Sequence, residues 1–76
     1  MSRAVLDARR LLCPMPVIRT QQQVQKMAPG DELEIVCTDP GAAHDIPAWC
    51  RVNGHRFLGA DQGPEELVLR LKVGDP

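Results

Sequence analysis

The sequence predicts an α/β two-layer sandwich (α+β) in the order βαβαββ, with a mixed four-stranded sheet and two helices on one face. Polar and apolar residues alternate over 32–38 and 65–73, which is typical of strands with one buried face. Helical patterns over 14–27 and 42–53 each follow a strand candidate. Strands with one polar face imply helices on the other face only. The 76 residues form one domain, 1–76.

The first half of the chain supplies a short strand at 4–6 and a helix at 14–27. Pro14 and Pro16 fit the first turn of that helix, because a first-turn N–H has no intrahelical partner to lose. The run Ala-Pro-Gly-Asp at 28–31 ends it, since proline cannot continue a helix and glycine takes a left-handed cap.

The strand at 32–38 directs Leu33, Ile35 and Cys37 inward. The following helix runs from Ala42 to near Asn53, and Pro47 inside it predicts a kink or a restart near Asp45. A strand at 55–60 and a turn at 61–64 follow. In the strand at 65–73 four apolar residues face inward: Leu67, Leu69, Leu71 and Val73.

Composition and charge restrict the function classes. A net charge of −1 does not favour nucleic-acid binding, and no apolar run approaches a membrane span. The N-terminus lacks a signal-peptide core, so a cytoplasmic location is expected. Three cysteines, an odd number, do not predict a disulfide framework. No metal site or cofactor is expected, because the cysteines stand alone and His44 and His55 show no ligand spacing.

Cys13 is the candidate catalytic residue. It lies at a strand-to-helix junction, where Pro14 and Pro16 fix the turn, and the start of a helix favours an anion. Arg9 and Arg10 add positive charge, so the thiol pKa is predicted to lie below its ordinary value. The alternative is a buried cysteine acting as a small hydrophobe.

The other two cysteines are predicted to be structural. Cys37 shares the inward face of its strand, and Cys50 lies on the apolar stripe of the second helix. Asp39 is first a turn and cap residue, but the strand it follows ends at the same sheet edge as the strand before Cys13. A thioredoxin-type redox enzyme is disfavoured, because Pro16 stands where its second cysteine would be.

Five segments in register resemble the TusA/SirA family of bacterial sulfur carriers. The resemblance covers nearly the whole chain, and the segments are Leu6-Asp7-Ala8-Arg9, Cys13-Pro14-Met15-Pro16, Pro29-Gly30-Asp31, Thr38-Asp39-Pro40-Gly41 and 45–50. Two residues depart from the family pattern. A glycine is common where this chain has Arg10, and a second aspartate is common where it has Thr38. The first departure concerns the turn into Cys13, and the second removes a carboxylate near it.

The resemblance implies a fold like the C-terminal domain of translation initiation factor three, with sheet order 1-2-4-3 and an antiparallel fourth strand. It also implies a sulfurtransferase acting from protein to protein. Cys13 would receive sulfur as a persulfide from a cysteine desulfurase or a rhodanese-like donor and pass it to an acceptor protein. The pathway stays open among tRNA thiolation, molybdenum-cofactor maturation and sulfur oxidation.

Sulfur transfer between proteins places the docking surface around Cys13. The predicted partner-binding residues are Arg9, Arg10, Met15 and Arg19, with Pro14, Pro16 and Asp39 in support. Neither a membrane nor a nucleic acid is expected as a partner. The rival reading is a regulatory or binding module whose open sheet face docks a protein or RNA, although the basic stripe with interleaved aromatics that RNA-binding sheets use is missing.

Overall fold

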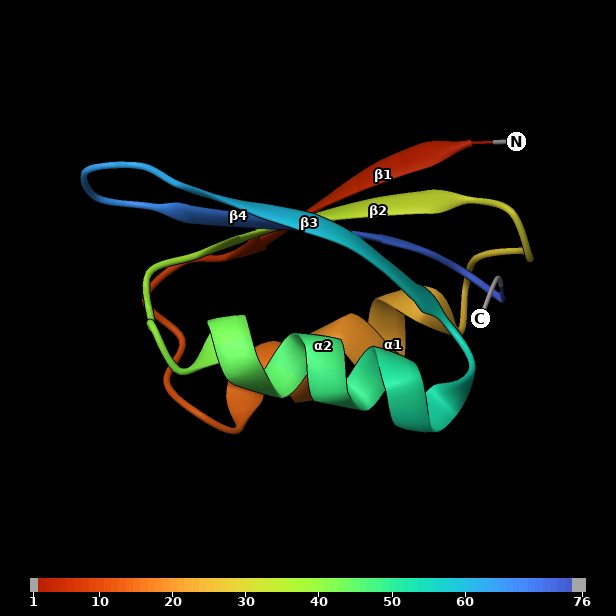
Figure 1. Ribbon diagram of the computed structural model, residues 1–76, viewed down its shortest axis with the longest axis horizontal. Helices are drawn as coiled ribbons and strands as arrows, with labels where there is room; N and C mark the ends of the chain where they lie inside the picture. The colour runs from red at the N-terminus through yellow and green to blue at the C-terminus, as the bar shows by residue number, and fades with distance from the viewer. Residues whose placement is uncertain (1, 75–76) are drawn as a thin grey trace.

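Strands and helices alternate along the chain in the order βαβαββ (Figure 1). The computed structural model describes residues 2–74. The elements are β1 (Arg3–Ala8), α1 (Met15–Val24), β2 (Glu32–Cys37), α2 (Ala42–Asn53), β3 (Arg56–Gln62) and β4 (Leu67–Lys72).

The four strands form one mixed sheet in the order β1-β2-β4-β3. Strands β1 and β2 are parallel, whereas β4 runs antiparallel to both of its neighbours, β2 and β3. Both helices lie against the same face of the sheet, and the other face is uncovered (Figure 1). The predicted two-layer fold and strand order are confirmed.

The core lies between this sheet face and the helices. Alternate residues of the two central strands are opposite one another, as in the pairs Leu33–Leu71 and Ile35–Leu69, and all four are at most 1% exposed. Ile46 of α2 is fully buried over them. The alternation that predicted these strands therefore reflects burial of one face against two helices.

Several boundaries differ from the prediction. Helix α1 ends at Val24 rather than at 27, because the chain turns after it through short-range bonds such as Met27 N–H to the Val24 carbonyl. Helix α2 is continuous through Pro47, so of the two alternatives expected near Asp45, a kink or a restart, the restart is wrong. Pro47 removes only one hydrogen bond, in the second turn, and packing of Ile46 beside it holds the helix on the sheet.

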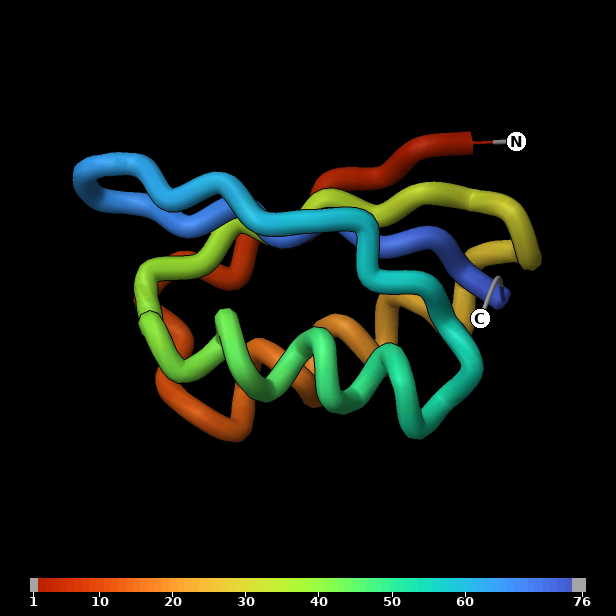
Figure 2. Tube along the Cα trace, in the orientation of Figure 1, coloured from red at the N-terminus to blue at the C-terminus, as the bar shows by residue number. Residues whose placement is uncertain are grey.

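The sheet register defines two edges of the molecule. Ala8, Cys37 and Leu67 are aligned at one edge, and Arg3, Glu32 and Lys72 at the other. The β1–α1 and β2–α2 connections both leave the first edge and lie side by side (Figure 2). Cys13 belongs to the first of these connections, as predicted for a residue after a strand end.

Candidate functional site

The backbone of Cys13 is fixed by the loop that precedes α2. Its N–H donates a hydrogen bond of 3.0 Å to Oδ2 of Asp39, and Oδ1 of the same carboxylate accepts the Gly41 N–H at 3.1 Å. Asp39 therefore joins the two connections at this edge. The structure places Asp39 beside Cys13, as its position after the second strand predicted.

The side chain of Cys13 contacts a second carboxylate, from α2. The Sγ–H group donates to Oδ2 of Asp45 over 3.2 Å. Asp45 lies in the first turn of α2 and is half-buried. Sequence analysis did not select Asp45 as a site residue. The signal was present, since an acidic residue in the first turn of the helix after the second strand lies near the edge that carries Cys13.

The predicted low pKa of Cys13 is wrong. The pKa of this thiol is raised, first by its hydrogen bond to the Asp45 carboxylate, then by partial burial and by the charges of Asp45 and Asp39. The start of α1 offers little compensation. Pro14 and Pro16 have no N–H, and the Met15 N–H is bonded to the Leu12 carbonyl at 2.8 Å.

The two arginines before Cys13 are directed elsewhere. The Arg9 guanidinium pairs with Asp7 at 2.9 Å and with Glu66 at 3.2 Å, so it spans from β1 to the β3–β4 hairpin. Arg10 is exposed and adopts a positive φ of 66°, in the left-handed region that favours glycine. Neither arginine is among the groups that shift the Cys13 pKa, contrary to the prediction.

The remaining predicted residues differ in exposure. Arg19 and Pro14 are exposed, Met15 is half-buried, and Pro16 is buried with its carbonyl accepting the Thr20 hydroxyl at 2.8 Å. Pro16 therefore supports the helix rather than the surface. An apolar residue that the prediction did not include is also prominent, since Leu12 beside Cys13 is 74% exposed.

Cys13 is the one exposed cysteine of the three. Cys37 and Cys50 are at most 1% exposed, as predicted, and burial raises the pKa of each thiol to about 11. Both are thus protonated and enclosed at neutral pH. Cys13 is the thiol that another protein can reach.

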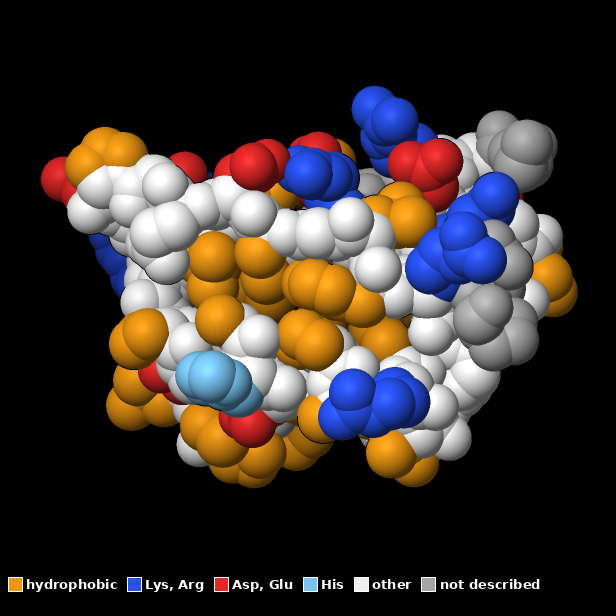
Figure 3. Space-filling view, viewed as in Figure 1, with side chains coloured by type: hydrophobic (Ala, Val, Ile, Leu, Met, Phe, Trp, Pro, Cys, Tyr) orange, Lys and Arg blue, Asp and Glu red, His pale blue; other side chains and the backbone are white. Residues whose placement is uncertain are grey.

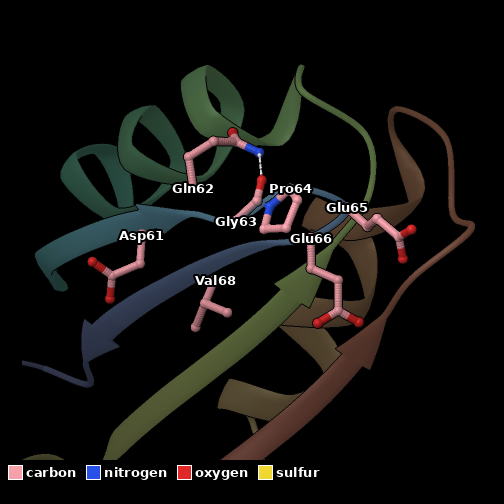
Figure 4. A pocket seen from close by; sticks show the side chains of 7 residues that line it. All are labelled: Asp61, Gln62, Gly63, Pro64, Glu65, Glu66 and Val68. Atoms are coloured by element: carbon pink, nitrogen blue, oxygen red, sulfur yellow. Dashed lines mark hydrogen bonds between the residues drawn. The ribbon is translucent and has the colours of Figure 1, made fainter.

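The surface has shallow depressions away from this thiol. One is formed by the β3–β4 hairpin, with Asp61, Gly63 and Val68 among its lining residues (Figure 4). Another lies between α2 and β3, where Figure 3 shows apolar side chains gathered, and Pro47, Cys50 and Phe57 line it. Cys13 lines neither of these two depressions, and its exposed side chain lies in the β1–α1 connection.

None of the helices within residues 2–74 combines the length and the apolar character that crossing a membrane requires.

Known proteins match nearly the whole chain. The family model described as Sulfurtransferase TusA matches residues 4–73. YrkI of Bacillus subtilis, named as a candidate sulfur carrier, is 44% identical over 69 residues, which are 91% of this chain and 89% of YrkI. The sulfur carrier protein TusA of Pseudomonas syringae pv. tomato is 41% identical over 66 residues, 87% of this chain and 77% of that protein.

Two further matches bear on length and fold. YrkF of Bacillus subtilis, another candidate sulfur carrier, is 40% identical over 70 residues, and this chain spans only 38% of its length. A crystal structure of a SirA-like protein from Desulfitobacterium hafniense aligns with a TM-score of 0.76 over 95% of this chain and 99% of that one. At 16% identity that likeness shows the shared fold.

A two-layer fold that displays one reachable thiol, together with these relatives, defines a small sulfur-carrier domain. The chain belongs to the TusA sulfurtransferase family.

Proposed function

We propose that Cys13 carries sulfane sulfur as a persulfide, received from a cysteine desulfurase or rhodanese-like donor and passed to a cysteine of an acceptor protein. The observation that supports this most directly is that Cys13 is exposed while Cys37 and Cys50 are buried. The burial of both other thiols also leaves no second reachable cysteine to release the cargo through an intramolecular disulfide.

The transfer needs no external oxidant or reductant. The Cys13 sulfur attacks the outer sulfur of the donor persulfide, a new S–S bond forms on Cys13, and the donor S–S bond breaks. The donor cysteine leaves with the electron pair of that bond and takes up the proton that Cys13 loses. Passing the cargo on repeats these steps, with Cys13 as the leaving thiol.

The docking surface in this proposal surrounds the Cys13 loop. Leu12 contributes an exposed apolar side chain, and Met15 contributes a half-buried one. Arg19 adds a positive charge on α1. Arg9 and Arg10 lie at the rim, on the side facing the β3–β4 hairpin. Apolar contacts at the centre set the lifetime of such a complex, whereas rim charges set the association rate and its salt dependence.

Incubation with a cysteine desulfurase and cysteine tests the proposal. The wild-type chain should gain the mass of one sulfur atom, and peptide mass spectrometry should locate it on Cys13. Cys13→Ser should abolish the gain. Loading that persists in Cys13→Ser would refute the proposal.

The buried cysteines provide the matched controls. Cys37→Ala and Cys50→Ala each remove a thiol from the core, so they should lower the free energy of unfolding while retaining loading at Cys13. Loss of loading in either variant while it remains folded would place the cargo elsewhere.

A further inference from the structure

The Asp45 carboxylate touches the sulfur atom to which we assign the cargo. Its Oδ2 accepts the Cys13 Sγ–H over 3.2 Å, across 32 residues of sequence. The contact joins α2 to the β1–α1 loop, and the transfer steps above do not require it. An acidic residue in the first turn also stabilises a helix through the dipole, so a purely structural role is the competing explanation.

We propose that Asp45 holds the Cys13 thiol protonated in the sulfur-free protein, so that Cys13 becomes reactive only when docking breaks their contact. This inference rests on the proposed function of Cys13. It assigns Asp45 a regulatory role at that site rather than a place in the transfer itself.

The physical basis is the reactivity of the thiolate, which is the attacking species in sulfur exchange. Ionisation of Cys13 would remove the Sγ–H donor and place a negative charge within hydrogen-bond distance of Asp45. Asp39, fixed on the Cys13 N–H, acts in the same direction. These carboxylates, from α2 and from the loop before it, are the charged groups that act on Cys13, and both raise its pKa.

Loading removes the hydrogen bond. Once Sγ is bonded to a second sulfur it has no proton to donate, because the S–S bond has replaced the S–H bond. An ionised persulfide is then repelled by Asp39 and Asp45 together, which turns the outer sulfur away from α2 and toward the partner. The same carboxylate therefore keeps the unloaded thiol unreactive and directs the bound outer sulfur toward the partner.

Alkylation of Cys13 with iodoacetamide against pH tests the inference without any partner protein. Asp45→Asn should lower the pH midpoint and speed alkylation several-fold near neutral pH, since more thiolate is present. Glu34→Gln, the same charge change on the uncovered sheet face, is the matched control and should leave the profile unchanged. An unchanged midpoint in folded Asp45→Asn would overturn the inference.

Two further measurements separate this role from a structural one. Asp45→Glu keeps the charge and should keep the raised midpoint. In the wild-type chain the carboxyl ¹³C resonance of Asp45 should shift as Cys13 ionises at alkaline pH, and Cys13→Ser should abolish that shift. Absence of an alkaline shift would show that the two side chains are not coupled and would overturn the inference, and this measurement needs no Asp45 variant to fold.

Failure of the inference is distinguishable from failure of the proposed function. If the wild-type chain takes up no sulfur on Cys13, the proposed function fails whatever the alkylation profile shows. If it takes up sulfur but Asp45→Asn keeps the wild-type midpoint, the inference about Asp45 alone is refuted.

Discussion

The backbone N–H of Arg10 donates a hydrogen bond of 2.8 Å to Oγ1 of Thr38. The resemblance noted in the sequence singled out these two residues as departures from the expected pattern, and the structure joins them directly. The bond fixes the end of β1 against the residue that follows β2, three residues before Cys13. The two departures therefore act together in shaping the turn into the site.

Arg10→Gly should stabilise the fold. A side chain at a φ of 66° is strained by about 1 kcal/mol, and glycine relieves it at some cost in unfolded-chain entropy. Because the N–H to Thr38 is a backbone group, it survives the substitution. Urea unfolding followed by the fluorescence of the single tryptophan measures the change, and a lower midpoint would contradict this expectation.

Leu12→Ser should slow sulfur loading without affecting stability. Leu12 is 74% exposed, so its replacement should change the free energy of unfolding by no more than about 0.5 kcal/mol. Val52, 80% exposed at the far end of α2, offers the matched control. Equal loading rates for Leu12→Ser and Val52→Ser would show that the apolar contact lies elsewhere.

Arg19→Glu should slow loading most at low ionic strength, because a rim charge acts on the association rate through a field that salt screens. Initial loading rates at low and high salt measure this. Arg51→Glu reverses an exposed charge in the last turn of α2 and should have a much smaller effect. A salt dependence identical to that of the wild type would exclude Arg19 from the rim.

Stability should fall above about pH 9. Cys37 and Cys50 ionise near 9.0 when unfolded, whereas burial raises the pKa of each to about 11 in the fold. The folded state then binds more protons, so each thiol lowers the free energy of unfolding by up to about 1.4 kcal/mol per pH unit within that window. The Cys37→Ala, Cys50→Ala double variant should show a shallower decline. A slope equal to that of the wild type would contradict the assignment.

Stability should also fall as the pH drops through about 6.5. Burial lowers the pKa of His55, and its Nδ1 accepts the Gly74 N–H at 2.9 Å, which only the unprotonated nitrogen can do. The unfolded state binds the proton first, so the contribution is present above that pH and lost below it. His55→Gln should flatten this dependence, and urea unfolding at a series of pH values measures it.

The sequence predicted best where one physical signal dominated. Alternation identified β2 and β4 because Leu33, Ile35, Leu69 and Leu71 are large and fully buried. The length of β1 was underestimated, since two of the three inward residues of this edge strand are alanines and give weak alternation, and Val5 points outward, 63% exposed. Propensity and pattern act locally, so they identify elements better than ends.

Only part of the site was predicted, again because sequence patterns act locally. Cys13 and Asp39 could be placed at one edge because parallel strands end together. The pKa of Cys13 was misjudged because the nearest charges along the chain, on Arg9 and Arg10, are not the nearest in space. The largest effect on this pKa comes from the hydrogen bond to the Asp45 carboxylate, and only the packing of α2 brings that carboxylate to the sulfur.

The register of the sheet also decides how this domain can be joined to others. Strand β1 begins at Arg3 and β4 ends at Lys72, both aligned with Glu32 at the edge opposite the Cys13 loop. A polypeptide fused before β1 or after β4 therefore leaves the molecule on the side away from the thiol (Figure 1). Such a fusion therefore leaves the loop that carries Cys13 free to meet a partner.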